Sequence, residues 1–171
     1  NAFSAAGHTT NLLTFRPGGS LARTVSSSVI HHALQPIDFR LVWFAPGLSG
    51  KVRSIAPEVI LCMGRMANGY AGRLQSRFRD VAVVGTVRTA RKLPAPYVRS
   101  LGTVRRVIAN SRAARDTLIR EYAVPAGKIA VIHNSLVFPA TLSPAADSTA
   151  REKVRARLGA PPATALLSSG A

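Results

Sequence analysis

Six short apolar runs, separated by turn residues and helix-like stretches, constrain the fold of this chain more than any other feature. They are residues 9–15, 40–45, 58–63, 81–87, 104–109 and 128–133. Most are continuously apolar, which is typical of strands that are covered on both faces. Apolar residues also recur at helical spacing in residues 68–78 and 111–122, the latter starting at Ser111, a good N-cap. Alternating strands and helices predict a doubly wound, parallel, Rossmann-like α/β sheet from Thr9 to His133, with 58–63 and 81–87 among its buried central strands.

The two ends of the chain differ from this middle part. Residues 1–7 are typical of the last turns of an amphipathic helix, with Phe3 and Ala6 inward and Gly7 as C-cap. A strand and a loop normally precede such a helix. After a linker rich in Pro, Ser, Ala and Thr come a charged helix and a final apolar run. We therefore expect a domain over residues 1–138 whose start is missing, a linker and short helix over 139–160, and the first strand of a second domain over 161–171.

Charge and cysteine content narrow the class of protein. The 171 residues include 23 basic and 7 acidic side chains, a net charge of +16. Such a balance favours polyanionic partners, although a GC-rich genome also produces Arg-rich chains. The single cysteine, Cys62, excludes an intrachain disulfide and a Cys-rich zinc site. No apolar run approaches the ~20 residues of a membrane-spanning helix. We expect a cytoplasmic setting.

The residues that follow the predicted strands are the candidate ligand-binding residues, because open α/β sheets bind ligands beyond the carboxyl ends of their strands. They are Gly64, Arg65, Thr86, Arg88, Asn110, Ser111, His133 and Asn134. A glycine lets the backbone approach a ligand closely, and Arg binds phosphate. Structural roles without ligand binding stay open as alternatives. Asn110 and Ser111 can cap a helix, His133 and Asn134 can form a turn, and each Arg can be a solvated surface residue.

Two further features have structural explanations. His31 and His32 have no Asp, Glu or Cys at ligand spacing, so we expect a surface pair on a helix and no metal site. Cys62 lies within an apolar strand and is expected to be a buried small hydrophobe.

Residues 107–137 carry the most specific motif, VIANSRAARDTLIREYAVPAGKIAVIHNSLV. This stretch resembles the strand ending in Asn-Ser, helix, Tyr-x-Val-Pro, strand and His-Asn-Ser of nucleotide-sugar-dependent glycosyltransferases of the two-Rossmann-domain (GT-B) type, family 4-like. Gly7-His8, the strand Pro57-Glu58-Val59-Ile60, the segment REKVRARLGAPP and a final strand ending at Gly170 are similar to that family in the same order.

The resemblance implies the acceptor-binding first half of a bacterial transferase, moving a hexose from a nucleotide-sugar donor to a glycan or lipid-linked acceptor of the cell envelope. It implies no cofactor, substrate-binding roles for the residues after the strands and for Gly170, and no activity of this part alone. Arg88 stands where the family commonly has His in a catalytic position. Arg is a poor general base, but it can stabilise negative charge.

Two expectations about partners follow. The competing function is a non-catalytic basic α/β domain that binds nucleic acid or another polyanion, but zinc-finger spacing and aromatic-interleaved basic stretches are lacking, so we expect no nucleic acid. Residues 65–79 carry four Arg, and residues 88–106 six basic side chains, without any acid. We therefore expect that the side of the protein carrying these basic residues docks peripherally on the anionic inner face of the cell membrane. The apolar residues Met66, Tyr70, Leu74 and Phe78 should face the sheet instead.

Overall fold

The computed structural model describes residues 2–41, 43–88, 92–134, 152–153, 155–157 and 159. The chain forms two compact units, Asn1–Asn134 and Ser135–Ala171. In the second unit, residues 152–153 and 155–157 are helical, in agreement with the short helix predicted within residues 139–160. The predicted linker, the final apolar run and Gly170 lie outside the described residues.

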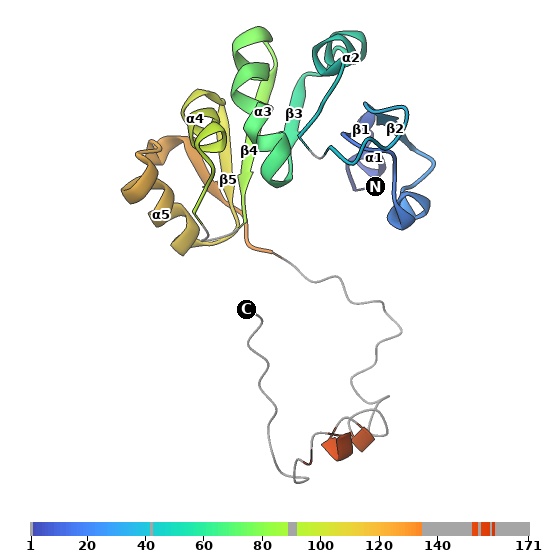
Figure 1. Ribbon diagram of the computed structural model, residues 1–171. Helices are drawn as coiled ribbons and strands as arrows, with labels where there is room; N and C mark the ends of the chain where they lie inside the picture. The colour runs from blue at the N-terminus through green and yellow to red at the C-terminus, as the bar shows by residue number, and fades with distance from the viewer. Residues whose placement is uncertain are drawn as a thin grey trace. The chain divides into compact units, whose positions relative to one another are not determined.

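The first unit contains two parallel sheets (Figure 1). Its elements are α1 (Ala2–Ala5), β1 (Thr10–Thr14), η1 (Ser20–Thr24), β2 (Val29–Ala33), α2 (Leu48–Ile55), β3 (Val59–Cys62), α3 (Gly64–Arg77), β4 (Ala82–Val87), α4 (Ala95–Thr103), β5 (Arg106–Ala109), α5 (Arg112–Tyr122), η2 (Ala126–Lys128) and β6 (Ile129–Val131). The larger sheet has the order β3-β4-β5-β6, and the smaller pairs β1 with β2. The parallel α/β class is thus confirmed, although the strands form two sheets where one was expected.

The core lies between the four-stranded sheet and the helices that follow its strands. Val83 and Val87 of β4 are buried together with Leu74 of α3, Leu101 of α4 and Leu118 of α5. Each of these helices connects one parallel strand to the next, and right-handed crossovers place all three helices on the same face. The prediction that 81–87 is a buried central strand is confirmed.

The prediction that 58–63 is a central strand is wrong, because β3 is an edge strand that pairs with β4 alone in the described part of the chain. Val59 and Leu61 of β3 are 61% and 39% exposed, whereas Cys62, which points to the opposite face, is buried. Apolar continuity therefore marked the strand correctly but not its position in the sheet.

In the apolar run at 40–45, none of the described residues 40–41 and 43–45 lies in a strand, so the strand predicted there is wrong. The buried side chain of Gln35 holds this segment in turns, because its Nε2 donates to the carbonyl oxygens of Leu41 (2.8 Å) and Phe44 (2.7 Å). Its Oε1 accepts a hydrogen bond from the Phe39 backbone N–H at 3.3 Å. A single side chain thus satisfies backbone groups that a sheet would otherwise pair.

The strand β2 occupies the sequence that was predicted to carry a helical His pair, so that prediction is wrong. The Nε2 atom of His31 lies 2.9 Å from Thr14 Oγ1, and that of His32 lies 3.0 Å from Asn11 Oδ1. Both contacts tie β2 to β1. Among the described residues, no group of three or more His, Cys, Asp or Glu could hold a metal ion.

The predicted helices differ in detail from the observed ones. The helix at 111–122 is confirmed as α5, and the other begins earlier than expected, at Gly64. The sequence did not predict α2 or α4; α4 has Pro94 as its N-cap residue and Pro96 in its first turn, where proline is tolerated. At the start of the chain Gly7 has a φ of +87°, as a C-cap should, but Phe3 is 61% exposed and does not point inward.

Candidate ligand-binding edge

The segments at the carboxyl ends of β3 to β6 bring the predicted site residues to one edge of the sheet. Because these strands are parallel and paired in sequence order, their carboxyl ends lie side by side. Following the order of the strands, this edge carries Gly64 and Arg65, then Thr86 and Arg88, then Asn110 and Ser111, then His133 and Asn134. The side chains of Arg65, Arg88, His133 and Asn134 are exposed.

A cavity of about 670 Å³ extends to the Gly64 end of this edge. The carboxyl ends of β1 and β3 both line it, through Phe15, Arg16, Met63, Gly64 and Arg65. Gly64 has a φ of +82°, which disfavours any residue with a Cβ, and open space surrounds the place where a Cβ would lie. Backbone and ligand can therefore approach closely at Gly64.

Thr86 is buried and its hydroxyl is engaged within the protein, donating to the Cys62 carbonyl oxygen at 2.9 Å. The Thr86 backbone N–H donates to Asn68 Oδ1 at 2.9 Å, and Asn68 Nδ2 donates to the carbonyl oxygens of Cys62 (3.1 Å) and Gly64 (2.8 Å). Tyr97 donates its hydroxyl proton to the Thr86 carbonyl oxygen. This network fixes the ends of β3 and β4, the strands that precede Arg65 and Arg88.

Burial changes the titration of two groups in this region. It raises the pKa of the Cys62 thiol to about 12, because the thiolate would be desolvated. Burial, with a smaller effect of the nearby Cys62, also raises the pKa of Tyr97 to about 12. Both groups are therefore neutral at physiological pH, and Cys62 is the buried, unreactive thiol that was predicted.

The capping explanation accounts for Ser111. Its Oγ accepts a hydrogen bond from the Ala114 backbone N–H at 3.1 Å, as an N-cap does. The neighbouring Asn110 is half-buried and donates from Nδ2 to the Arg88 carbonyl oxygen at 3.4 Å. Asn110 therefore restrains the backbone at Arg88.

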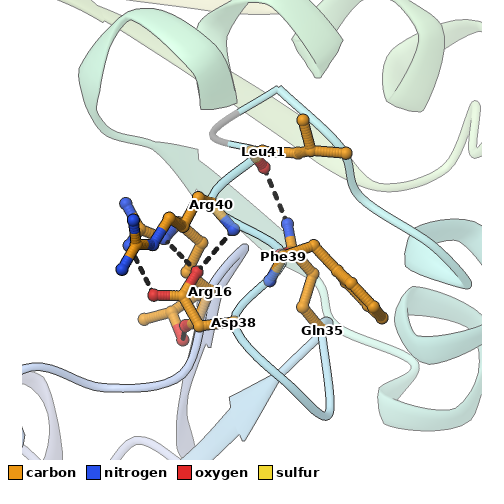
Figure 2. Close-up of polar contacts among 7 residues, drawn as sticks. Arg16, Gln35, Asp38, Phe39, Arg40 and Leu41 are labelled. Atoms are coloured by element: carbon orange, nitrogen blue, oxygen red, sulfur yellow. Dashed lines mark hydrogen bonds and ion pairs between the residues drawn. The ribbon is translucent and has the colours of Figure 1, made fainter.

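Arg16 is a candidate that the sequence analysis missed. Figure 2 shows its guanidinium group paired with the carboxylate of Asp38. Arg16 Nε lies 2.7 Å from Asp38 Oδ1, and a terminal guanidinium nitrogen lies 2.5 Å from Oδ2. The Arg40 backbone N–H donates to Asp38 Oδ1 at 2.8 Å. Hydrogen bonds from Arg16 and Arg40 lower the pKa of Asp38 to about 2. The position of Arg16 directly after the first apolar run could have pointed to it, but its partner lies 22 residues away.

This edge is suited to binding anions. The side chains described above are cationic or neutral, apart from Asp38, whose charge is paired with Arg16. Guanidinium groups bind phosphate oxygens in a fork and stabilise developing negative charge. Fold and edge together define a Rossmann-like α/β domain with a basic edge that is the candidate ligand-binding site.

Comparison with known proteins gives the family. The model of Glycosyltransferase Family 4 matches residues 1–136, and the chain belongs to this family. Among solved structures, the fold is similar to the crystal structure of a glycosyltransferase from Rickettsia africae ESF-5, with a TM-score of 0.62 and 16% sequence identity. That match covers 94% of this chain and 44% of the other, so the chain spans less than half of its neighbour's length. No curated protein matches the sequence.

Proposed function

We propose that this chain is the acceptor-binding half of a GT-B glycosyltransferase, which moves a sugar from a nucleotide-sugar donor to a glycan or lipid-linked acceptor of the bacterial cell envelope. The observation that carries the proposal is the basic carboxyl edge in a chain that belongs to Glycosyltransferase Family 4. Family membership also favours an enzyme over the alternative of a nucleic-acid-binding domain. Residues 161–171, including Gly170, would begin the donor-binding domain. The acceptor-binding half would not catalyse sugar transfer by itself.

In this proposal Arg88 and Arg65 bind phosphate oxygens of the substrates. Both are exposed, and both follow strands whose ends Asn68 and Thr86 fix. Arg88 carries a guanidinium group, which is a poor general base. Its contribution would be to stabilise negative charge as the sugar leaves its phosphate. His133 and Asn134 would hydrogen-bond sugar hydroxyls from the segment that follows β6.

The same proposal includes peripheral docking on an anionic membrane, where a lipid-linked acceptor is found. Arg73, Arg77 and Arg99 of α3 and α4 line a depression of about 1080 Å³, together with Trp43. The sequences of α2, α3 and α4 contain six basic and no acidic residues, which favours an anionic surface as partner. No helix among the described residues has the length and apolar character needed to cross a membrane.

The apolar stripe of α3 supports docking by charge. Leu74 is buried and Met66, Tyr70 and Phe78 are half-buried, so most of this surface is already used in packing. The Tyr70 ring packs edge-on against Phe15, with ring centroids 5.4 Å apart.

The test is a transfer assay on a polypeptide that joins this chain to a donor-binding domain. Radiolabelled nucleotide sugars and a membrane extract as acceptor source should give labelled glycan or glycolipid. Arg88→Ala should lower kcat/KM about 100-fold, the order of the loss when one charge-stabilising group is removed. Arg120→Ala, which removes an exposed Arg late in α5, is the matched control and should leave transfer unchanged. Equal activity of the two variants would refute the role of Arg88, and absence of transfer from every nucleotide sugar would refute the function.

A further inference from the structure

Two arginines that line the 670 Å³ cavity differ in how their charge is balanced. Arg16 lies just past the end of β1 and pairs with Asp38, and the two side chains are 40% and 42% exposed. Arg65 is also exposed and lines the same cavity, but it makes no ion pair with any residue that the structure describes. An electroneutral Arg–Asp pair and an unneutralised guanidinium group therefore border one cavity, and both are accessible to a ligand.

The surrounding backbone holds the Arg16–Asp38 pair in place (Figure 2). The Arg40 N–H donates to Asp38 Oδ1, and Arg40 has a φ of +58°, which is uncommon for a residue with a side chain. The buried amide of Gln35 fixes the loop on that side through its three backbone hydrogen bonds. On the other side, the Thr14 hydroxyl donates to the Arg16 carbonyl oxygen at 2.7 Å. Strained backbone that its surroundings hold fixed is typical of binding sites.

The pair has hydrogen-bonding capacity that the described part of the chain does not use. Asp38 Oδ1 accepts from Arg16 Nε and from the Arg40 N–H, whereas Oδ2 accepts from one terminal nitrogen of Arg16. The other terminal nitrogen of Arg16 has no hydrogen-bond partner among the described residues. A carboxylate oxygen has room for a second donor, and a terminal guanidinium nitrogen carries two N–H groups. The pair can therefore accept a hydrogen bond from one hydroxyl group and donate one to its neighbour.

We propose that the Arg16–Asp38 pair binds two neighbouring hydroxyl groups of the acceptor sugar, and that Arg65 binds a phosphate attached to that sugar. The acceptor class is then a glycosyl phosphate, either free or carried on a lipid, and this assignment rests on the proposed function. A neutral polyol suits the pair, because its charges cancel, whereas phosphate suits the unneutralised Arg65.

The ionisation of Asp38 supports a binding role. Hydrogen bonds from Arg16 and from the Arg40 backbone lower its pKa to about 2. The carboxylate is therefore ionised at physiological pH and accepts hydrogen bonds from hydroxyl groups without taking a proton from them.

Binding of small probes to the 171-residue chain tests the proposal without any transfer reaction. The probes are the 1-phosphates of glucose, galactose and mannose, monodeoxy analogues of the one that binds most tightly, and inorganic phosphate. Dissociation constants are measured by NMR titration. The variants are Asp38→Asn, Arg16→Gln and Arg65→Gln, and the matched control is Arg120→Gln, which removes an exposed Arg of α5. Asn retains the shape of Asp, and an exposed ion pair contributes little to stability, so Asp38→Asn should fold.

Arg65→Gln should weaken binding of the hexose phosphate about tenfold or more, and Arg120→Gln should leave it unchanged. Removing a contacted sugar hydroxyl should cost the unsubstituted chain about tenfold in affinity but cost Asp38→Asn little, because that contact is already lost. An equal cost in both chains, or no binding of any hexose phosphate, would overturn the proposal. So would an Arg16→Gln variant that loses affinity for inorganic phosphate as Arg65→Gln does, since Arg16 would then bind phosphate itself.

The transfer assay separates this proposal from the proposed function. In the polypeptide joined to a donor-binding domain, Asp38→Asn should raise the KM for the acceptor and change kcat little. Transfer to an isoprenyl-linked glycosyl phosphate, but not to the free one, would identify the lipid as the carrier. Probe binding without transfer from any nucleotide sugar would refute only the proposed function, whereas transfer with an unchanged acceptor KM in Asp38→Asn would refute only the proposed subsite.

Discussion

Asn68 Oδ1 accepts a hydrogen bond from the backbone N–H of Thr86 at 2.9 Å, so one helix side chain fixes the end of the neighbouring strand. The Nδ2 of the same amide donates to the carbonyl oxygens of Cys62 and Gly64, at the end of β3. Asn68 is 1% exposed, so water cannot replace these bonds. The first turn of α3, which carries Arg65, and the end of β4 before Arg88 are therefore held by a structural residue that touches neither arginine in the contacts described.

Replacing Asn68 should destabilise the fold strongly. Asn68→Ala leaves the Thr86 N–H and two carbonyl oxygens without this partner, at about 1–3 kcal/mol for each buried group that stays unsatisfied. We expect a loss of about 3 kcal/mol in the free energy of unfolding, measured by urea denaturation. Thr86→Val keeps the bond from its backbone N–H to Asn68 and loses the hydroxyl bond to Cys62 and the long 3.5 Å bond from Asn68 Nδ2, so it should cost about 1 kcal/mol. Equal costs for the two variants would contradict this assignment.

Two glycines of α3 should respond oppositely to the same substitution. A Cβ at Gly72 would lie 2.9 Å from the Ser100 Cα of α4, whereas a Cβ at Gly69 would meet nothing within 4 Å. Gly72→Ala should therefore force α3 and α4 apart and destabilise the protein by about 1–3 kcal/mol. Gly69→Ala should stabilise it by about 0.5–1 kcal/mol through helix propensity. Thermal unfolding of both variants measures this, and a stabilised Gly72→Ala would show that the helices pack less closely.

How far the sequence predicts this structure depends on whether a feature is local or depends on pairing across the chain. Strands such as β4, in which Thr86 is the only polar side chain, were predicted. β2 was missed because its His31 and His32 make the segment polar, and their partners on β1 are distant in sequence. The segment at 40–45 was mistaken for a strand because nothing local reveals the bonds from Gln35.

The candidate site follows the same rule. Arg65, Arg88 and His133 could be placed at one edge because each lies within three residues after the end of a strand, and parallel strands end together. Neither Arg16 nor Asn68 could be assigned, because the role of each depends on a residue at least 18 positions away.

The Cys62 thiol should make stability fall in alkaline solution. Its pKa is about 12 in the folded protein, against about 8.5 for an unfolded thiol. The unfolded chain therefore loses this proton first, so the contribution is complete below about pH 8.5 and is lost as pH rises towards 12. The free energy of unfolding of Cys62→Ala should fall less steeply between pH 8.5 and 11 than that of the unsubstituted chain.

Thiol labelling gives a second measurement of the same property. At pH 8 the native chain should react with a disulfide reagent only as fast as it opens, and the urea-unfolded chain should react at once. Fast labelling of the native chain, or identical alkaline slopes with and without the thiol, would contradict the burial of Cys62.

The surface of α3 and α4 that carries Arg73, Arg77 and Arg99 should bind anionic vesicles through charge. Each Lys or Arg near such a surface contributes about 1 kcal/mol, so replacing Arg73, Arg77 and Arg99 together by Gln should weaken vesicle affinity on the order of a hundredfold. Binding should also fade with salt, because the Debye length falls from ~30 Å at 0.01 M to ~3 Å at 1 M. Trp43 is 57% exposed and lines the same depression as these arginines, so it tests whether the protein inserts into the membrane. Trp43→Ala should change the vesicle affinity little if docking is electrostatic.

The matched control replaces Arg112, Arg115 and Arg120 of α5 by Gln. It removes the same charge from a helix that also carries Asp116 and Glu121, and it should weaken vesicle binding much less. Co-sedimentation with vesicles of phosphatidylglycerol and of phosphatidylcholine measures all three variants. Equal losses for the two triple variants would mean that net charge alone drives binding, and equal binding to neutral vesicles would contradict an electrostatic docking surface on α3 and α4.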